Sequence, residues 1–266
     1  MRARAYYTPT YVIRQEKENT CTVKIEIQGR LVKTKLRYLR QGRAGGGRRG
    51  AIREFSRASR RRLLQLLARL EFRGAIFITL TFPGPALPSP AQAKAALFAF
   101  LKRLGRRYPG LSCVWRFEWE SSGERDYHPH FHLLVFGADF IPKEEVTRLW
   151  GEILGVEALW ATRVERVRSF RGVMSYAAKY LGKAGLVYDA YLSAQYGSLG
   201  RVWGVWGRER LPFAVLVVVK VAWGRWFWTW KRYARRYFRR VVPGAAGFFL
   251  LIRNPERWLK LLLSVV

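Results

Sequence analysis

The sequence is poor in the residues that several common classes of site require. Its 266 residues include two cysteines, Cys21 and Cys113, too few for a disulfide framework or a four-cysteine zinc site. Acidic residues are also scarce, 18 against 49 lysines and arginines, which gives a formal net charge of +31. Because so large a charge repels itself, it favours a polyanionic partner, nucleic acid first, over a merely solvated basic surface.

Long apolar segments are missing as well. No run of apolar residues reaches the roughly 18 that a membrane-spanning helix needs, and the run at 211–219 covers about half of that length. The first ten residues lack the apolar stretch of a secretory signal. We therefore expect a cytoplasmic protein without a membrane partner, in a reducing compartment.

Composition divides the chain into three zones. Residues 1–50 form a basic extension, in which alternating apolar and charged residues at 20–39 predict a hairpin around Gly29 and Arg30, and the glycine- and arginine-rich stretch 42–50 predicts a linker. Residues 51–212 form the main domain, and residues 213–266 a basic aromatic region.

The main domain alternates helical and strand patterns, which predicts an α+β fold with a central antiparallel sheet and flanking helices. Helical spacing joins Ile52, Phe55, Leu63, Leu66, Leu67 and Leu70, and Gly74 ends that pattern. Strands are predicted at 75–81, 114–120, 131–136 and near 159–167, and helices at 89–107, from 142 toward 154, and at 171–181.

All three histidines fall between His128 and His132. Alternate residues of a strand share a face, so His130 and His132 project side by side, about 6.6 Å apart at the backbone, and can grip one cation. His128 has the same parity but lies about 13 Å from His132 along an extended chain, too far to share the ion. It is expected at the lip of the strand, before a proline tolerated only where a strand begins.

The neighbouring strand offers a third ligand. Trp115, Phe117 and Trp119 are expected to pack inward, which leaves Glu118 and Glu120 on the histidine side. If Glu120 lies across from His130, Glu118 lies across from His132, and either carboxylate can complete the site. Two imidazoles and a carboxylate with open positions suit Mn²⁺ or Mg²⁺.

A second cluster lies at 176–183. Tyr176 and Tyr180 are four residues apart, as are Lys179 and Lys183, so on a helix each pair lies on one face. A phenol is almost fully protonated at neutral pH, and a nearby ammonium favours its nucleophilic phenolate form. Tyr180 has Lys179 beside it and Lys183 one turn on, which makes it the first choice as nucleophile. The alternative is a helix with aromatic core contacts and solvated lysines.

These patterns occur in a particular order along the chain: Phe77 to Phe82, then His128 to His132, then Tyr176 to Lys183. Together they resemble the three motifs of the HUH endonucleases that initiate rolling-circle replication in small plasmids and phages. The resemblance covers about residues 74–212, and the segment Gly200 to Gly207 is similar to one that follows the tyrosine helix in some of these initiators. It implies a ferredoxin-like, RRM-like palm.

The resemblance also implies roles for individual residues. His130 and His132 would be the histidine pair, Glu118 the third metal ligand, and Tyr180 and Tyr176 the active tyrosines of a two-tyrosine class. Such an enzyme nicks single-stranded origin DNA through a 5′-phosphotyrosine link and leaves a 3′-OH for a polymerase. No G-x-x-x-x-G-K-[ST] loop occurs, so we expect a separate host helicase to unwind the duplex.

Three other functions are considered. A relaxase uses the same chemistry, but its tyrosine normally precedes the histidine motif, and here it follows. A rolling-circle transposase usually carries a cysteine-rich zinc module, which two cysteines cannot build. A non-catalytic packaging or architectural DNA-binding protein would also explain the charge.

The C-terminal zone combines aromatic and basic residues. On a helix, Trp223, Trp226, Trp230, Tyr233 and Tyr237 would share one face and Arg232, Arg235, Arg236 and Arg239 the other. This pattern fits a DNA clamp, an aromatic face packed on the body of the protein, or a membrane-surface helix.

Overall fold

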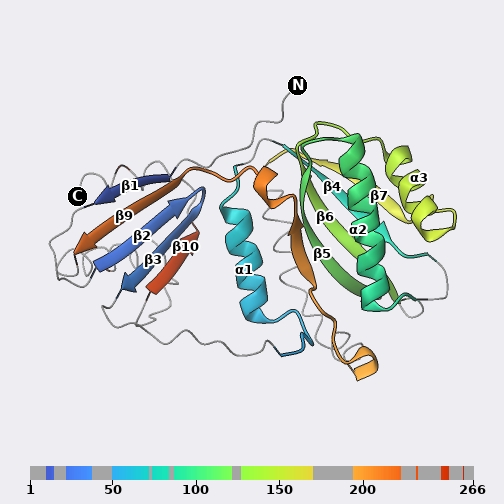
Figure 1. Ribbon diagram of the computed structural model, residues 1–266, viewed down its shortest axis with the longest axis horizontal. Coiled ribbons are helices and arrows are strands. Elements are labelled where there is room, and N and C mark those ends of the chain that lie inside the picture. Colours follow the sequence, from blue (N-terminus) through green and yellow to red (C-terminus); the bar gives the residue numbers. More distant parts are fainter. Residues whose placement is uncertain are drawn as a thin grey trace. The chain divides into compact units, whose positions relative to one another are not determined.

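The computed structural model describes residues 10–14, 22–37, 50–71, 74–83, 87–121, 127–169, 194–222 and 247–251, together with the single residues 232 and 260 (Figure 1). The chain divides into two compact units. The first contains residues 1–6, 48–67 and 72–212, and the second contains residues 7–47, 68–71 and 213–266.

The first unit is built on a five-stranded sheet with strand order β7-β4-β6-β5-β8. All neighbouring strands of this sheet are antiparallel. Its elements are α1 (Arg57–Ala68), β4 (Ala75–Thr81), α2 (Pro90–Arg107), β5 (Ser112–Ser121), β6 (Tyr127–Phe136), α3 (Lys143–Leu154), β7 (Thr162–Val167), β8 (Trp203–Trp206) and the 3₁₀ turn η1 (Arg208–Arg210). The predicted α+β fold, with an antiparallel sheet and flanking helices, is confirmed.

The predicted helix start at residue 89 is also confirmed. The Ser89 hydroxyl accepts a hydrogen bond from the backbone N–H of Gln92, and the Gln92 side chain accepts one from the backbone N–H of Ser89. This capping box satisfies two N–H groups that have no partner within the helix, and Pro90 fits the first helical position because its missing N–H is not needed there.

α1 begins later than the apolar spacing suggested, at Arg57. The Ser56 side chain accepts a hydrogen bond from the backbone N–H of Ser59, which caps the helix at this point. The preceding residues take another partner, since the carbonyl of Ile52 accepts a hydrogen bond from the N–H of Leu199.

One face of this sheet packs against α2 and α3. The core joins alternate strand residues to apolar residues of the two helices and includes Ile78, Leu80, Trp115, Phe117, Phe131, Leu133, Leu97, Phe100, Leu104, Val146 and Trp150. Trp115 and Phe117 are each 2% exposed, as their predicted inward position requires. Gly204 of β8 pairs with Trp115, and a Cβ there would lie 2.7 Å from the indole, so this position needs glycine.

The second unit contains a sheet with strand order β1-β9-β2-β3-β10. Its strands are β1 (Thr10–Arg14), β2 (Thr22–Gln28), β3 (Leu31–Arg37), β9 (Leu216–Ala222) and β10 (Gly247–Leu251), and only β1 and β9 are parallel neighbours. β2 and β3 form the predicted hairpin. Gly29 in its turn has φ 52°, and a Cβ there would lie 2.7 Å from the carbonyl oxygen of Ala68.

Several predicted segments lie outside the described residues. These are the linker before Gly50, the helix at 171–181, and the aromatic-basic helix of the C-terminal zone apart from Arg232. Within the described part of the chain, no helix is both long and apolar enough to cross a lipid bilayer.

Candidate metal centre

β5 and β6 bring Glu118, His130 and His132 together on the sheet face opposite α2 and α3. Glu118 pairs directly with His130, and His132 is two residues farther along the same strand. Alternate strand residues share a face, and the residues between these three, Phe117 and Phe131, are in the core on the other side.

The hairpin register differs from the one supposed from the sequence. Glu118 lies across from His130, Glu120 from His128, and Arg116 from His132. The hairpin closes with Ser121 opposite Tyr127, which shifts the register by two residues. Because the shift is even, the carboxylates keep the same face, and the change selects which residue is opposite each histidine.

The three side chains have the spacing of ligands around one ion. Glu118 Oε2 lies 3.5 Å from His132 Nε2 and 3.7 Å from His130 Nε2, and one ligand atom of each residue lies within 4.8 Å of the others. Atoms held about 2.1 Å from a shared ion are roughly 3.0 to 3.4 Å apart in octahedral or tetrahedral geometry. The cluster therefore fits a divalent cation after a small contraction.

The surroundings of the cluster keep Glu118 ionised. Burial by itself would raise the pKa of this carboxyl, but the His130 and His132 imidazoles and the Arg116 guanidinium outweigh burial and lower the pKa to about 2. Glu118 is 8% exposed and His130 is 7% exposed. A buried carboxylate that stays charged is ready to bind a cation without first losing a proton.

Arg116 is a member of the site that sequence reasoning missed. Its Nε lies 3.7 Å from Glu118 Oε1, and its Nη1 donates hydrogen bonds to the carbonyls of Phe117 and, at 3.2 Å, Val202. The guanidinium also lies over the Phe55 ring, 3.8 Å from its centroid. The only available signal was its parity, because Arg116 is two residues before Glu118 and so shares its face.

Thr79 and Phe77, from β4, orient His132. Thr79 Oγ1 lies 3.2 Å from His132 Nδ1, and the Phe77 ring stacks on the imidazole with centroids 5.4 Å apart. A bond from the Nδ1 hydrogen to a hydroxyl leaves Nε2 as the metal-binding nitrogen, which is the nitrogen that faces Glu118. The sequence marked Thr79 only as a strand position below the site.

Replacing Thr79 by valine is therefore expected to weaken Mn²⁺ binding by about 10-fold or more, since outer partners of ligating histidines typically contribute 10- to 100-fold. Valine keeps the shape and the β propensity and removes only the hydroxyl. Thr79→Ser should recover most of the affinity, and Thr81→Val, on the same face of the same strand, is the matched control. Calorimetric titration with Mn²⁺ measures all three variants, and wild-type affinity in Thr79→Val would contradict the role.

Pro129 lies inside β6, two residues after its first residue, and not at the strand's start as expected. Its carbonyl accepts a hydrogen bond from the N–H of Phe82, so its ring nitrogen faces the side on which β4 has already ended at Thr81. No ladder bond to β5 is lost, which is why proline is tolerated there. His128 is consequently a strand residue, paired with Glu120.

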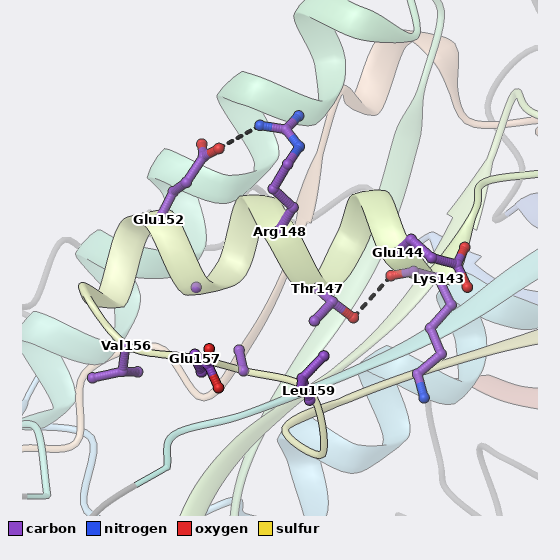
Figure 2. A pocket seen from close by; sticks show the side chains of 10 residues that line it. Lys143, Glu144, Thr147, Arg148, Glu152, Val156, Glu157 and Leu159 are labelled. Carbon is purple, nitrogen blue, oxygen red and sulfur yellow. Dashed lines mark hydrogen bonds and ion pairs between the residues drawn. The ribbon is translucent and has the colours of Figure 1, made fainter.

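A pocket next to α3 shares no residue with the metal cluster. It is lined by α3 residues and by the chain that follows the helix (Figure 2). Figure 2 shows Arg148 paired with Glu152, and the Thr147 hydroxyl donating to the carbonyl of Lys143. Charges of both signs line this pocket, so it lacks the uniform charge that a polyanion would require.

The predicted nucleophiles and their lysines, Tyr176, Lys179, Tyr180 and Lys183, lie outside the described residues. Their roles stay predictions.

Comparison with protein families adds independent information. Residues 75–185 match a family model of replication-associated proteins, the ORF2 type. The matched segment begins with β4, includes all three residues of the metal cluster, and extends past the Tyr176–Lys183 stretch. This similarity supports a role in the initiation of replication. No curated protein and no solved structure matches the chain.

Proposed function

We propose that this protein is a rolling-circle replication initiator of the HUH endonuclease superfamily, two-tyrosine class, which nicks and rejoins single-stranded DNA at an origin. The observation that carries the proposal is the meeting of Glu118, His130 and His132 on one sheet face, within the segment similar to replication-associated proteins. A structural ion-pair cluster would need no second imidazole aimed at the same carboxylate oxygen.

The metal cluster gives the site its role toward phosphate. A bound Mn²⁺ or Mg²⁺ would polarise a non-bridging oxygen of the scissile phosphate and fix its orientation. Two imidazoles and one carboxylate leave coordination positions for that oxygen and for water. Thr79 and Arg116 hold His132 and Glu118 in place for this purpose.

Tyr180 supplies the attacking atom in the proposed reaction. Its phenol loses a proton to solvent, and the phenolate oxygen forms a bond to phosphorus while the bond from phosphorus to the 3′ oxygen breaks. The departing 3′ oxygen takes up a proton and becomes the 3′-OH primer. Lys179 and Lys183 balance the charge that develops during the transfer.

No water is consumed, so the energy of the phosphodiester is kept in the tyrosine ester and the step is reversible. Tyr176 serves a second transfer, in which a 3′-OH attacks the tyrosine ester and closes the displaced strand. Only one tyrosine can be in line with the bound phosphate at a time. A helicase and a polymerase supplied by the host complete the replication cycle.

The test is covalent capture. The protein is incubated with a library of single-stranded DNA and Mn²⁺, denatured, and the DNA that remains attached is sequenced. We expect recurrent 5′ ends at one sequence, and their loss with EDTA or in Glu118→Gln. DNA that is retained before denaturation but never attached covalently would instead identify a non-catalytic DNA-binding protein.

A further inference from the structure

Two rows of cross-strand neighbours lead from the metal cluster to β7. Thr79 of β4 pairs with His132 on one side and with Arg163 on the other. Thr81 pairs with His130, and its backbone N–H donates to the carbonyl of Ala161 at 2.8 Å. Because directly paired residues share a face, the face that carries the metal ligands continues across β4 to β7.

β7 is an edge strand of this sheet, and both rows end there in exposed side chains. The Arg163 side chain is 72% exposed, and Trp160, next to Ala161, is 65% exposed. With strands about 4.8 Å apart, Arg163 stands roughly 10 Å from His132 at the backbone. A cation and an indole thus flank the cluster at one strand's remove.

The present partner of Arg163 leaves it able to bind an anion. Arg163 Nη2 lies 2.7 Å from Glu165 Oε1, and the Glu165 side chain is 33% exposed. An ion pair this open to water is weak, because solvent and salt screen it. A guanidinium binds a phosphate through two parallel hydrogen bonds, so a phosphate can displace the carboxylate.

We propose that the β7 edge, formed by Arg163 and Trp160, binds the segment of single-stranded DNA that adjoins the scissile phosphate, so that the strand runs from the metal cluster over β4 to β7. This inference rests on the proposed function and adds the path of the DNA. Arg163 binds a phosphate, and the Trp160 indole stacks on a base, the combination by which proteins hold single strands without reading sequence. The half-buried Thr79 and Thr81 lie along the path.

The phosphate contact is tested with Arg163→Gln and a control on the same strand. Arg166 is also exposed but pairs with Ile76 of the opposite, helix-covered face, so Arg166→Gln removes the same charge from the wrong side. Binding of labelled oligo(dT) is measured over a salt series with EDTA, so that no transfer occurs. We expect the salt slope to fall by about 0.7 log units in Arg163→Gln for one lost phosphate contact, and to stay unchanged in Arg166→Gln.

The stacking contact has a different signature. Trp160→Ala should weaken oligo(dT) binding by about 5- to 100-fold without changing the salt slope, because stacking involves no counterion. Phe140→Ala is the control, since Phe140 is 73% exposed but follows the far end of β6 from His130. Circular dichroism and Mn²⁺ titration establish that each variant keeps the fold and the cluster.

The outcomes separate this inference from the proposed function. Equal salt slopes in Arg163→Gln and wild type, equal affinities in Trp160→Ala and Phe140→Ala, or equal competition by duplex DNA would overturn the β7 path. The covalent capture assay on the same variants stands apart: a chain that binds oligo(dT) through Arg163 and Trp160 but never attaches DNA keeps the edge site and loses the nicking function.

Discussion

Tyr180→Phe is expected to form little or no covalent adduct with the single-stranded DNA that the wild-type protein captures. Phenylalanine keeps the ring and removes only the oxygen that would attack phosphorus. Tyr180 has Lys179 beside it in sequence and Lys183 three residues on, one helical turn away, and so more nearby positive charge than Tyr176. The yield of protein–DNA adduct after denaturation, and its site by mass spectrometry, measure the effect.

The paired variant gives the control for this assignment. Tyr176→Phe should still nick, because its loss affects the closing transfer, and the double variant should be inert. A normal yield from Tyr180→Phe, mapped to Tyr176, would reverse the order of the two tyrosines. An adduct formed by the double variant would refute a tyrosine nucleophile at either position.

The second large effect concerns the metal cluster. Replacement of His130 or His132 by alanine, or of Glu118 by glutamine, should lower Mn²⁺ affinity by more than the roughly 10- to 100-fold typical of an outer partner, and should abolish nicking. Each change removes one of three ligand atoms that lie within 4.8 Å of one another. Calorimetric titration with Mn²⁺ gives the affinities, and covalent capture gives the activity.

His128→Ala and Glu120→Gln are the matched controls, since both residues lie on the same two strands and pair with each other one step beyond Glu118 and His130. Both variants should bind Mn²⁺ as the wild type does. A loss in His128→Ala as large as that in His130→Ala would show that the ion sits elsewhere on the hairpin. A loss confined to Glu120→Gln would transfer the carboxylate role from Glu118.

The sequence by itself determined which residues share a face. Alternation of side chains follows from the geometry of one extended strand, so the common face of Glu118, His130 and His132, and the inward position of Trp115 and Phe117, could be predicted before any strand was paired. The start of α2 could be predicted for the same reason, because a cap is a contact between residues three apart.

Only the tertiary structure decided what those faces meet. Parity is unchanged by a two-residue shift, so the pattern could not tell whether His130 pairs with Glu118 or Glu120, and the closed hairpin set the pair. Thr79 and Arg163 came to the metal face because β4 and β7 take their places beside β6. Strands 10–14 and 22–37 likewise share a sheet with strands 216–222 and 247–251, far along the chain. Strand order of this kind depends on the summed packing of residues distant in sequence, which no local period encodes.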